Sequence, residues 1–303
     1  MCSIYQDAGQ HNELSVEQIE HIFTILRSLG LIYVSIGGGE PLLRDDLSVI
    51  IRSLREKGLM VRLLTNGILA DKGIIKELVS AGLRDVSISL DTLDPAKQDD
   101  IYNRKDSWDD IKKALDLFAE MLPRRKRILI NTVVSPFNIL ELPALSQFAE
   151  KMGCHISFIP IESSSDSRFI FTDEDCQNID KTYGALIEAK KKGRGNIFNS
   201  VRFLGNSRQY LKSQKRNWAC DAGNLYLSIN PGGEFSICHK YKPEMSINDS
   251  NFKEYFLSGE FRNKRSDLIH HCDGCLRPCW AETSFLLNDA NCLWEMIRNK
   301  ILS

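Results

Sequence analysis

The sequence lacks the features that most quickly identify a nucleic-acid-binding, membrane or secreted protein. Its 39 Lys and Arg residues balance 40 Asp and Glu residues, which leaves a net charge of −1. This balance gives no electrostatic reason to expect nucleic acid or an anionic membrane surface as a partner. The sequence also contains no run of about 18 apolar residues, so no membrane-spanning helix is expected.

A secretory signal is missing as well, because mostly polar residues follow Met1. We therefore expect a cytoplasmic protein, in which clustered cysteines indicate metal binding more often than disulfides. The sequence shows no short internal repeat or low-complexity tract. With 303 residues, 43% of them hydrophobic, the chain is long enough for one large α/β domain, or for one domain with an appendage.

Apolar runs alternate with segments of helical periodicity in the first 192 residues. The apolar runs predict strands that begin near Leu31, Met60, Asp85, Arg127 and His155. The intervening segments predict helices, the first of them opened by a capping box at 15–18. Repeated alternation of this kind predicts parallel strands joined by right-handed helical crossovers, which is an α/β fold.

The pattern changes after about residue 192. The stretch 192–195 is predicted to be a linker, which divides the chain into residues 1–192 and 193–303. Beyond it, apolar runs at 225–229 and 234–237 flank Asn230-Pro231-Gly232-Gly233, a signal for a β-hairpin.

Cysteines in the last third of the chain are the strongest chemical signal. They are Cys220, Cys238, Cys272, Cys275, Cys279 and Cys292. Two cysteines that are two residues apart bring two thiolates to one ion, and a second pair at the ends of a hairpin can complete a four-thiolate site. The residues alone leave a structural zinc site and an iron–sulfur cluster open, and a disulfide is the weaker alternative. Cys154 and Cys176 stand apart and are interpreted as packing residues.

A glycine-rich stretch follows the first predicted strand, which ends in Gly37-Gly38-Gly39-Glu40-Pro41. Glycines without Cβ atoms let a ligand approach the backbone, and α/β sheets bind ligands at the carboxyl ends of their strands. The stretch is not a Walker loop, because no Gly-Lys-Ser/Thr follows. By itself it fits a ligand cradle and a plain tight turn equally well.

Three motifs at successive strand ends resemble the radical S-adenosylmethionine (radical SAM) superfamily. They are Gly38-Gly39-Glu40-Pro41, Thr65-Asn66-Gly67 and Ser87-x-Ser89-x-Asp91. The tail, from Cys220 through the hairpin to Cys238 and on to Cys272 and Cys275, resembles the SPASM/Twitch auxiliary-cluster domain of that superfamily. The resemblance implies a partial (β/α)6 TIM-like barrel over residues 1–192, followed by a small Cys-rich domain over residues 193–303.

The resemblance also implies a binding site for SAM. Its residues would be Gly38, Gly39, Glu40, Thr65, Asn66, Ser87, Ser89, Asp91 and Asn131. In the family the Gly-Gly-Glu segment binds the methionine amino group, and the serine/aspartate region faces the ribose and the methionyl carboxylate. Without the resemblance, alternating serines also fit a half-exposed strand, and Asp91 fits a helix cap.

The start of the chain departs from the family pattern. The family signature Cys-x3-Cys-x2-Cys binds a catalytic [4Fe–4S] cluster, whereas only Cys2, in the place of the third cysteine, is present. We therefore expect a chain that is truncated within this motif and lacks the first barrel strand, with a degenerate relative as the alternative. A barrel without its first strand would expose a sheet edge.

The tail carries fewer cysteines than the two clusters of a full SPASM domain need, so one auxiliary [4Fe–4S] cluster is expected. Its predicted ligands are Cys220, Cys238, Cys272 and Cys275, with Cys279 and Cys292 as competitors. The histidines His239 and His271 are weaker competitors, for which a surface or packing role is the simpler interpretation.

By resemblance, the complete enzyme would cleave SAM reductively into methionine and a 5′-deoxyadenosyl radical, with an electron donor such as flavodoxin or ferredoxin. The radical would abstract hydrogen from a small-molecule or peptide substrate. One auxiliary cluster fits dehydrogenation of a polyol or aminosugar by an oxidoreductase, and peptide maturation is the alternative reaction. A non-catalytic domain with a four-cysteine zinc site is the alternative from a different class, and iron against zinc content separates the two.

Overall fold

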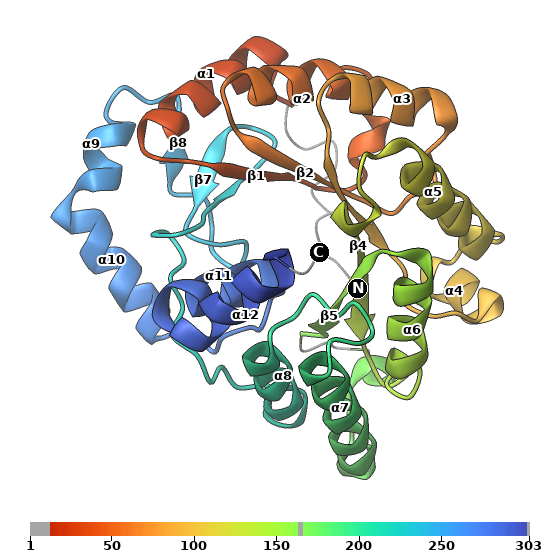
Figure 1. The fold of residues 1–303 in the computed structure, drawn as a ribbon. Helices are drawn as coiled ribbons and strands as arrows, with labels where there is room; N and C mark the ends of the chain where they lie inside the picture. The colour runs from red at the N-terminus through yellow and green to blue at the C-terminus, as the bar shows by residue number, and fades with distance from the viewer. Residues whose placement is uncertain (1–12, 163–165, 302–303) are drawn as a thin grey trace.

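The computed structural model describes residues 13–162 and 166–301. Five strands form one parallel sheet in sequence order, and helices cover its outer side (Figure 1). The strands are β1 (Tyr33–Ile36), β2 (Met60–Thr65), β3 (Asp85–Ser89), β4 (Ile128–Val134) and β5 (His155–Pro160). The predicted α/β class of the partial barrel is therefore confirmed, and each strand starts within two residues of its predicted position.

Helices precede or follow each strand, as the alternating pattern predicts. They are α1 (Val16–Ser28), α2 (Leu47–Glu56), α3 (Lys72–Ser80), α4 (Pro95–Tyr102), α5 (Ser107–Met121), α6 (Leu142–Met152) and α7 (Cys176–Lys191). Short 3-10 turns lie at η2 (Pro41–Leu43), η3 (Arg125–Arg127), η4 (Ser167–Phe169) and η5 (Asp173–Asp175). The capping box of α1 is present, because the Ser15 N–H donates to Gln18 Oε1 at 2.9 Å and the Gln18 N–H donates to Ser15 Oγ at 3.3 Å.

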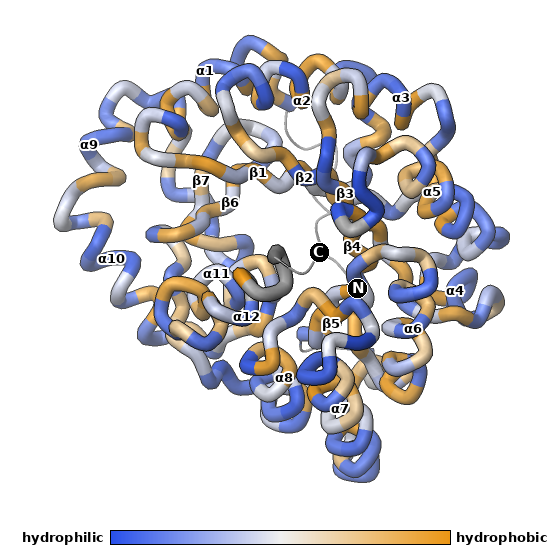
Figure 2. The backbone as a smooth tube through the Cα atoms, viewed as in Figure 1, coloured by the Kyte–Doolittle hydropathy of each residue, from blue (hydrophilic) through white to orange (hydrophobic). Residues whose placement is uncertain are grey.

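The two faces of the parallel sheet differ in polarity. The outer face packs on the helices through apolar side chains such as Val61, Val86, Ile130 and Phe158, all 1% exposed or less. Figure 2 shows the hydrophobic residues that run along these strands. The inner face carries the polar side chains Ser35, Arg62, Asp85, Ser87, Ser89, Asn131, His155 and Ser157. Successive side chains in a strand point to opposite faces of the sheet. These polar side chains therefore all lie on the face that is turned away from the covering helices.

The C-terminal part contains a small antiparallel sheet and five helices. Its elements are α8 (Val201–Ser213), β6 (Ser228–Ile229), β7 (Glu234–Ser236), β8 (Met245–Ser246), α9 (Phe252–Leu257), α10 (Gly259–His270), α11 (Pro278–Asn288) and α12 (Ala290–Ile301). β6 and β7 pair antiparallel around the turn at 230–233, so the predicted hairpin is confirmed. The third strand, β8, pairs with β7 and was not predicted.

The N-terminal part, residues 13–192, and the C-terminal part, residues 193–301, pack against each other at two places. After the predicted linker the chain returns to the sheet, where the Ile156 N–H donates to Asn196 O at 3.1 Å and the Phe198 N–H donates to Ile156 O at 2.7 Å. On the other side, Ile22 and Leu26 of α1 belong to the C-terminal core. In Figure 1 the C-terminal elements lie between α1 and α8 and complete the ring.

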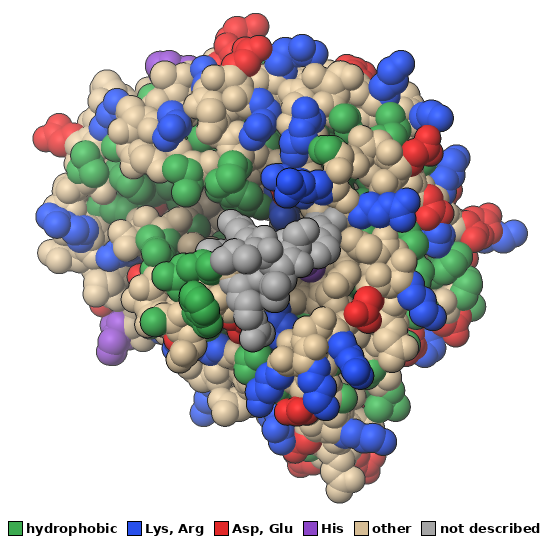
Figure 3. All heavy atoms as spheres, viewed as in Figure 1, with side chains coloured by type: hydrophobic (Ala, Val, Ile, Leu, Met, Phe, Trp, Pro, Cys, Tyr) green, Lys and Arg blue, Asp and Glu red, His purple; other side chains and the backbone are tan. Residues whose placement is uncertain are grey.

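Hydrophobic side chains on the viewed face gather toward the inner border of this ring, and most charged side chains lie on its outer rim (Figure 3). Among the helices of the described residues, none combines the length and the hydrophobicity that crossing a bilayer requires.

Candidate functional site

The loop after β1 presents bare backbone. Gly38 has φ +135°, a conformation that favours glycine. Among the described residues, no heavy atom lies within 4 Å of a Cβ atom built on Gly38 or on Gly39, which leaves room in front of this backbone. Gly37 differs, because its Cβ would lie 3.2 Å from Leu64 Cδ1. Gly37 is therefore constrained by its packing against Leu64, whereas Gly38 and Gly39 leave room for a ligand.

The Glu40 carboxylate joins the ends of β1 and β2. Its Oε1 accepts hydrogen bonds from Thr65 Oγ1 at 2.7 Å and from the Leu42 N–H at 3.0 Å. Its Oε2 accepts from the Asn66 N–H at 2.8 Å. Hydrogen bonds to an ionised acceptor are among the stronger ones in proteins. Both oxygens thus have protein partners, and the geometry gives Glu40 the task of holding the glycine loop in position.

Three further predicted residues lie on the inner face of the sheet. Ser87 and Ser89 point away from the apolar outer face, and Ser89 lies in register with Asn131 on the neighbouring strand β4. Ser89 and Asn131 are half-buried, whereas Ser87 is 2% exposed and accepts from Arg62 Nη1 at 3.4 Å. The structure therefore brings the three side chains to one surface, as ligand binding at strand ends requires.

Asp91 connects the carboxyl ends of β3 and β4. Its Oδ1 accepts from the Val133 N–H at 2.7 Å, and its backbone O accepts from Asn138 Nδ2 at 2.8 Å. The Asp91 N–H donates to Gln98 Oε1 at 3.0 Å. Burial raises the pKa of Asp91 to about 6, partly opposed by the Val133 hydrogen bond. A carboxyl group with this pKa changes charge close to neutral pH.

Sequence reasoning missed Arg62, Gln98 and Asn138. Arg62 lies on the inner face with Nη2 3.5 Å from Asp85 Oδ1, and Gln98 and Asn138 are 0% and 1% exposed. Each of them orders backbone or charge around the predicted residues. No spacing in the sequence marks them, because polar residues are ordinarily exposed in strands, helices and loops alike.

The predicted auxiliary ligands lie in three places. Cys238 is in the turn after β7, Cys272 and Cys275 are in the turn at 272–275, and Cys220 is on the segment between α8 and β6. The Lys240 N–H donates to Cys238 Sγ at 3.4 Å, and the Gly274 N–H donates to Cys272 Sγ at 3.3 Å. The Cys220 Sγ lies 3.2 Å from the Tyr226 hydroxyl. Burial raises the pKa of Cys238, and the nearby Cys272 and Cys220 thiols raise it further. These three thiols are therefore electrostatic neighbours.

The described His, Cys, Asp and Glu side chains do not form a ready-made metal site. Within residues 13–162 and 166–301, no three His, Cys, Asp or Glu side chains converge closely enough to hold a metal ion. The eight described cysteines are free thiols. The two N–H···S bonds suit thiolate ligands, and the set of Cys220, Cys238, Cys272 and Cys275 stays a prediction.

The other predicted metal ligands have different surroundings. Cys279 is exposed in the first turn of α11. Cys292 is buried in α12, where burial first, and then Asp289, raises the pKa of its thiol to about 11. Cys2 lies outside the described residues.

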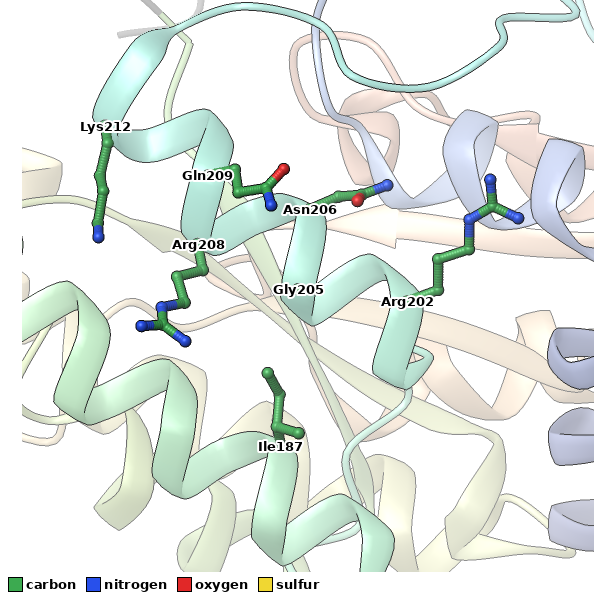
Figure 4. A pocket seen from close by; sticks show the side chains of 7 residues that line it. All are labelled: Ile187, Arg202, Gly205, Asn206, Arg208, Gln209 and Lys212. Carbon is green, nitrogen blue, oxygen red and sulfur yellow. The ribbon is translucent and has the colours of Figure 1, made fainter.

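A surface groove of about 500 Å³ lies elsewhere, between α7 and α8 (Figure 4). Its lining includes Arg202, Arg208 and Lys212. Arg208 and Lys212 pair with Asp180, and Arg202 pairs with Asp289 at 2.7 Å. Since these cations already have carboxylate partners, the groove offers no specific attraction for an anionic ligand.

Known proteins resemble this chain over its first half and, more distantly, over most of its length. Residues 1–149 match the model of the radical SAM superfamily. A protein named probable GTP 3',8-cyclase, from Methanocaldococcus jannaschii, is 31% identical over 167 residues, which cover 52% of each chain. A PqqA peptide cyclase from Xanthomonas oryzae pv. oryzae is 24% identical over 241 residues, which cover 78% of this chain and 62% of the relative.

Among solved structures, Streptococcus suis SuiB bound to S-adenosylmethionine has the same fold. The TM-score is 0.66 at 16% identity, and the match covers 84% of this chain and 62% of SuiB. The chain spans about half to two thirds of the length of these relatives. The family match covers the glycine loop, the Glu40 bridge and the inner-face residues of β1 to β4. The chain therefore carries a radical SAM domain over residues 1–149.

Proposed function

We propose that this chain is the SAM-binding and auxiliary-cluster-bearing part of a radical SAM enzyme that modifies a peptide. The choice of a peptide substrate rests on how many residues of this chain each relative matches. The match to the PqqA peptide cyclase spans 241 residues and reaches beyond the radical SAM domain. The matches to probable GTP 3',8-cyclases span about half of the chain.

In this proposal SAM binds at the carboxyl ends of β1 to β4. The open backbone at Gly38 and Gly39 receives its methionine end, and Glu40 holds that loop through Thr65 and Asn66. The ribose and carboxylate face the polar set Ser87, Ser89, Asp91 and Asn131. When bound, SAM and a [4Fe–4S] cluster supply the radical that takes hydrogen from the substrate.

We further propose that Cys220, Cys238, Cys272 and Cys275 hold one auxiliary [4Fe–4S] cluster, with Cys279 or Cys292 as a replacement ligand. The support is that Cys272 and Cys220 lie near enough to raise the pKa of the Cys238 thiol, and that backbone N–H groups are directed at Cys238 and Cys272. Cys2 would supply one thiolate to the catalytic cluster. A reductant of the flavodoxin or ferredoxin type, in the cytoplasm, would supply the electron.

Dehydrogenation of a small polyol or aminosugar, which would make the protein an oxidoreductase, is the second candidate reaction. It rests on the expectation of a single auxiliary cluster. The peptide is preferred, because the match to the PqqA peptide cyclase covers 78% of this chain, whereas the matches to probable GTP 3',8-cyclases cover about half of it.

The testing experiment uses anaerobically purified and iron–sulfur-reconstituted protein. Iron, sulfide and zinc are measured per chain, and 5′-deoxyadenosine is quantified after addition of SAM and dithionite. About four irons without zinc would support the auxiliary cluster, and about eight would support both clusters. Zinc without iron would overturn the proposal and leave a structural module.

The substrate class is tested on the same protein with a synthetic peptide library and with a panel of polyols, aminosugars and GTP. Stimulated formation of 5′-deoxyadenosine by peptides alone is the expected result. Stimulation by a small molecule alone would overturn the peptide assignment and leave the SAM chemistry intact.

A further inference from the structure

Glu162 lies where the parallel sheet meets the cysteine-bearing turns. It follows the end of β5 by two residues, and its side chain is 24% exposed. Its Oε1 accepts a hydrogen bond from Arg277 Nε at 2.7 Å and lies 3.7 Å from His239 Nε2. Its Oε2 lies 3.5 Å from Lys240 Nζ. One carboxylate of the barrel thus contacts three side chains of the C-terminal part.

The three partners are neighbours of the cysteines in sequence. His239 and Lys240 directly follow Cys238, and Arg277 lies between Cys275 and Cys279. The contacts of Glu162 therefore lie within two residues of the cysteines in these turns.

The two turns are also tied to each other. Lys240 Nζ donates to Gly274 O at 2.8 Å, which joins the turn after β7 to the turn at 272–275. The His239 ring lies 4.6 Å from the Trp280 ring, and the Arg277 guanidinium lies 5.7 Å from it. Glu162 therefore contacts two turns that are already joined to each other by a hydrogen bond and by their packing on Trp280.

The charges make this contact stronger than an ordinary surface ion pair. Burial would raise the pKa of Glu162, but the neighbouring His239, the charge and hydrogen bond of Arg277 and the charge of Lys240 together lower it to about 2. Isolated surface pairs contribute little, because solvent screens them and two long side chains lose entropy. A half-buried carboxylate with several partners in a network is held in one geometry more firmly.

We propose that Glu162 is a positioning residue that holds the two cysteine turns against the carboxyl end of β5. If the turns hold the auxiliary cluster, Glu162 would also fix the distance between that cluster and the SAM site, and this part of the inference rests on the proposed function. The positioning itself concerns only residues of this chain and does not require a bound cluster.

The test compares three variants of the metal-free chain by hydrogen–deuterium exchange with mass spectrometry. Glu162→Gln removes the charge and keeps the shape, and Glu162→Asp keeps the charge. The matched control is Glu244→Gln, because the Glu244 carboxylate is 6% exposed and pairs with Lys264 and Tyr255 inside the C-terminal part. Peptides that cover 238–241 and 272–280 report on the two turns, and amides of β2 report on the barrel.

We expect Glu162→Gln to accelerate exchange in both turns by about tenfold while β2 keeps its protection. Glu162→Asp should restore most of the protection, and Glu244→Gln should leave the two turns unchanged. Unchanged exchange in Glu162→Gln, or equal acceleration in β2 and the turns, would overturn the inference.

A second measurement on iron-loaded protein connects the inference to the cluster. Loss of the negative charge beside Cys275 should raise the reduction potential of the auxiliary cluster in Glu162→Gln relative to the unmodified chain and to Glu244→Gln. An unchanged potential would show that Glu162 does not act on the cluster. If the chain bound no iron, the proposed function would fail, and the exchange experiment on metal-free protein would still decide the positioning role.

Discussion

The Thr65 hydroxyl donates a hydrogen bond to the Glu40 carboxylate at 2.7 Å, and so joins the end of β2 to the loop that follows β1. The same hydroxyl accepts from the Gly67 N–H at 3.0 Å. Thr65 is 5% exposed, so this bond is shielded from solvent. The glycine loop is therefore held by the neighbouring strand and not by its own sequence alone.

Replacing Thr65 tests this relationship. A hydrogen bond to a charged group contributes about 1.5–3 kcal/mol, so Thr65→Val should weaken SAM binding by about 10- to 100-fold. Equilibrium dialysis with labelled SAM on reconstituted protein measures the change. Thr65→Ser should bind nearly as well as the unmodified chain, and Thr24→Val, an exposed change on α1, is the control. Equal SAM affinity in Thr65→Val would argue against a role for the bridge.

Asp91 should make SAM binding depend on pH. Its pKa is raised to about 6, mainly by burial, and the hydroxyls of a bound ribose would donate more strongly to the ionised carboxylate than to the neutral acid. The affinity should therefore rise with pH and level off above about 6, being about tenfold weaker at pH 5 than at the plateau. Isothermal titration across pH 5 to 8 would measure this profile. Asp91→Asn should flatten it, and an identical slope in that variant would assign the dependence to another group.

Gly274 should not tolerate a side chain. It has φ +94°, and a Cβ atom there would lie 2.0 Å from Arg216 Cβ. Gly274→Ala should therefore lower the thermal midpoint by several degrees, through at least about 1 kcal/mol of backbone strain plus the clash. It should also reduce the iron bound after reconstitution, since this glycine N–H donates to Cys272 Sγ. Gly259→Ala is the matched control, because a Cβ at Gly259 would meet no described atom within 4 Å, and similar losses in both variants would contradict this explanation.

Glu282 should make stability depend on pH. Its carboxylate accepts from the Ser200 N–H at 2.7 Å, next to the buried ion pair of Lys190 and Glu295 at 3.3 Å. Burial raises the pKa of Glu282 from 4.5 to about 7, although the Ser200 hydrogen bonds and Lys190 oppose the rise.

The folded state therefore binds the Glu282 proton more tightly than the unfolded state does. The resulting stability is fully present below about pH 4.5 and is lost as the pH rises to about 7. Glu282→Gln should reduce this loss by about 1–2 kcal/mol, or a few degrees in thermal midpoint, when scans at pH 5 and pH 8 are compared. The exposed Glu56→Gln change should keep the full pH dependence, and a Glu282→Gln profile that matches it would contradict the assignment.

The cysteines should differ in their effect on iron content. Cys238→Ser and Cys272→Ser should each lose about four irons per chain after reconstitution, because a thiolate ligand of one cluster is removed. Cys176→Ser, on α7 and away from the two turns, should keep them. Elemental analysis with the absorbance spectrum measures this. Retention of iron in Cys272→Ser together with loss in Cys279→Ser or Cys292→Ser would change the ligand set.

Local sequence accounts for most of the secondary structure. The Ser15 capping box, the five strand positions and the hairpin at 230–233 each depend on residues only a few positions apart, and each appears as predicted. The polar alternation in β3 also indicated that Ser87 and Ser89 share a face, because side chains in a strand alternate with a period of two. The helix α4 was not predicted, because its residues show little amphipathic contrast, although Asp94 as N-cap and Pro95 at the first helical position are a local start signal.

Contacts between distant segments could not be predicted in this way. The inner-face cation Arg62, the return of 196–199 to the edge of β5 and the link between Glu162 and Arg277 depend on how the layers pack. Glu162 and Arg277 are 115 residues apart, and the sequence around one of them does not indicate a contact with the other. Periodicity and turn chemistry are properties of a short stretch of chain, whereas the meeting of two such stretches is set by burial of the whole core.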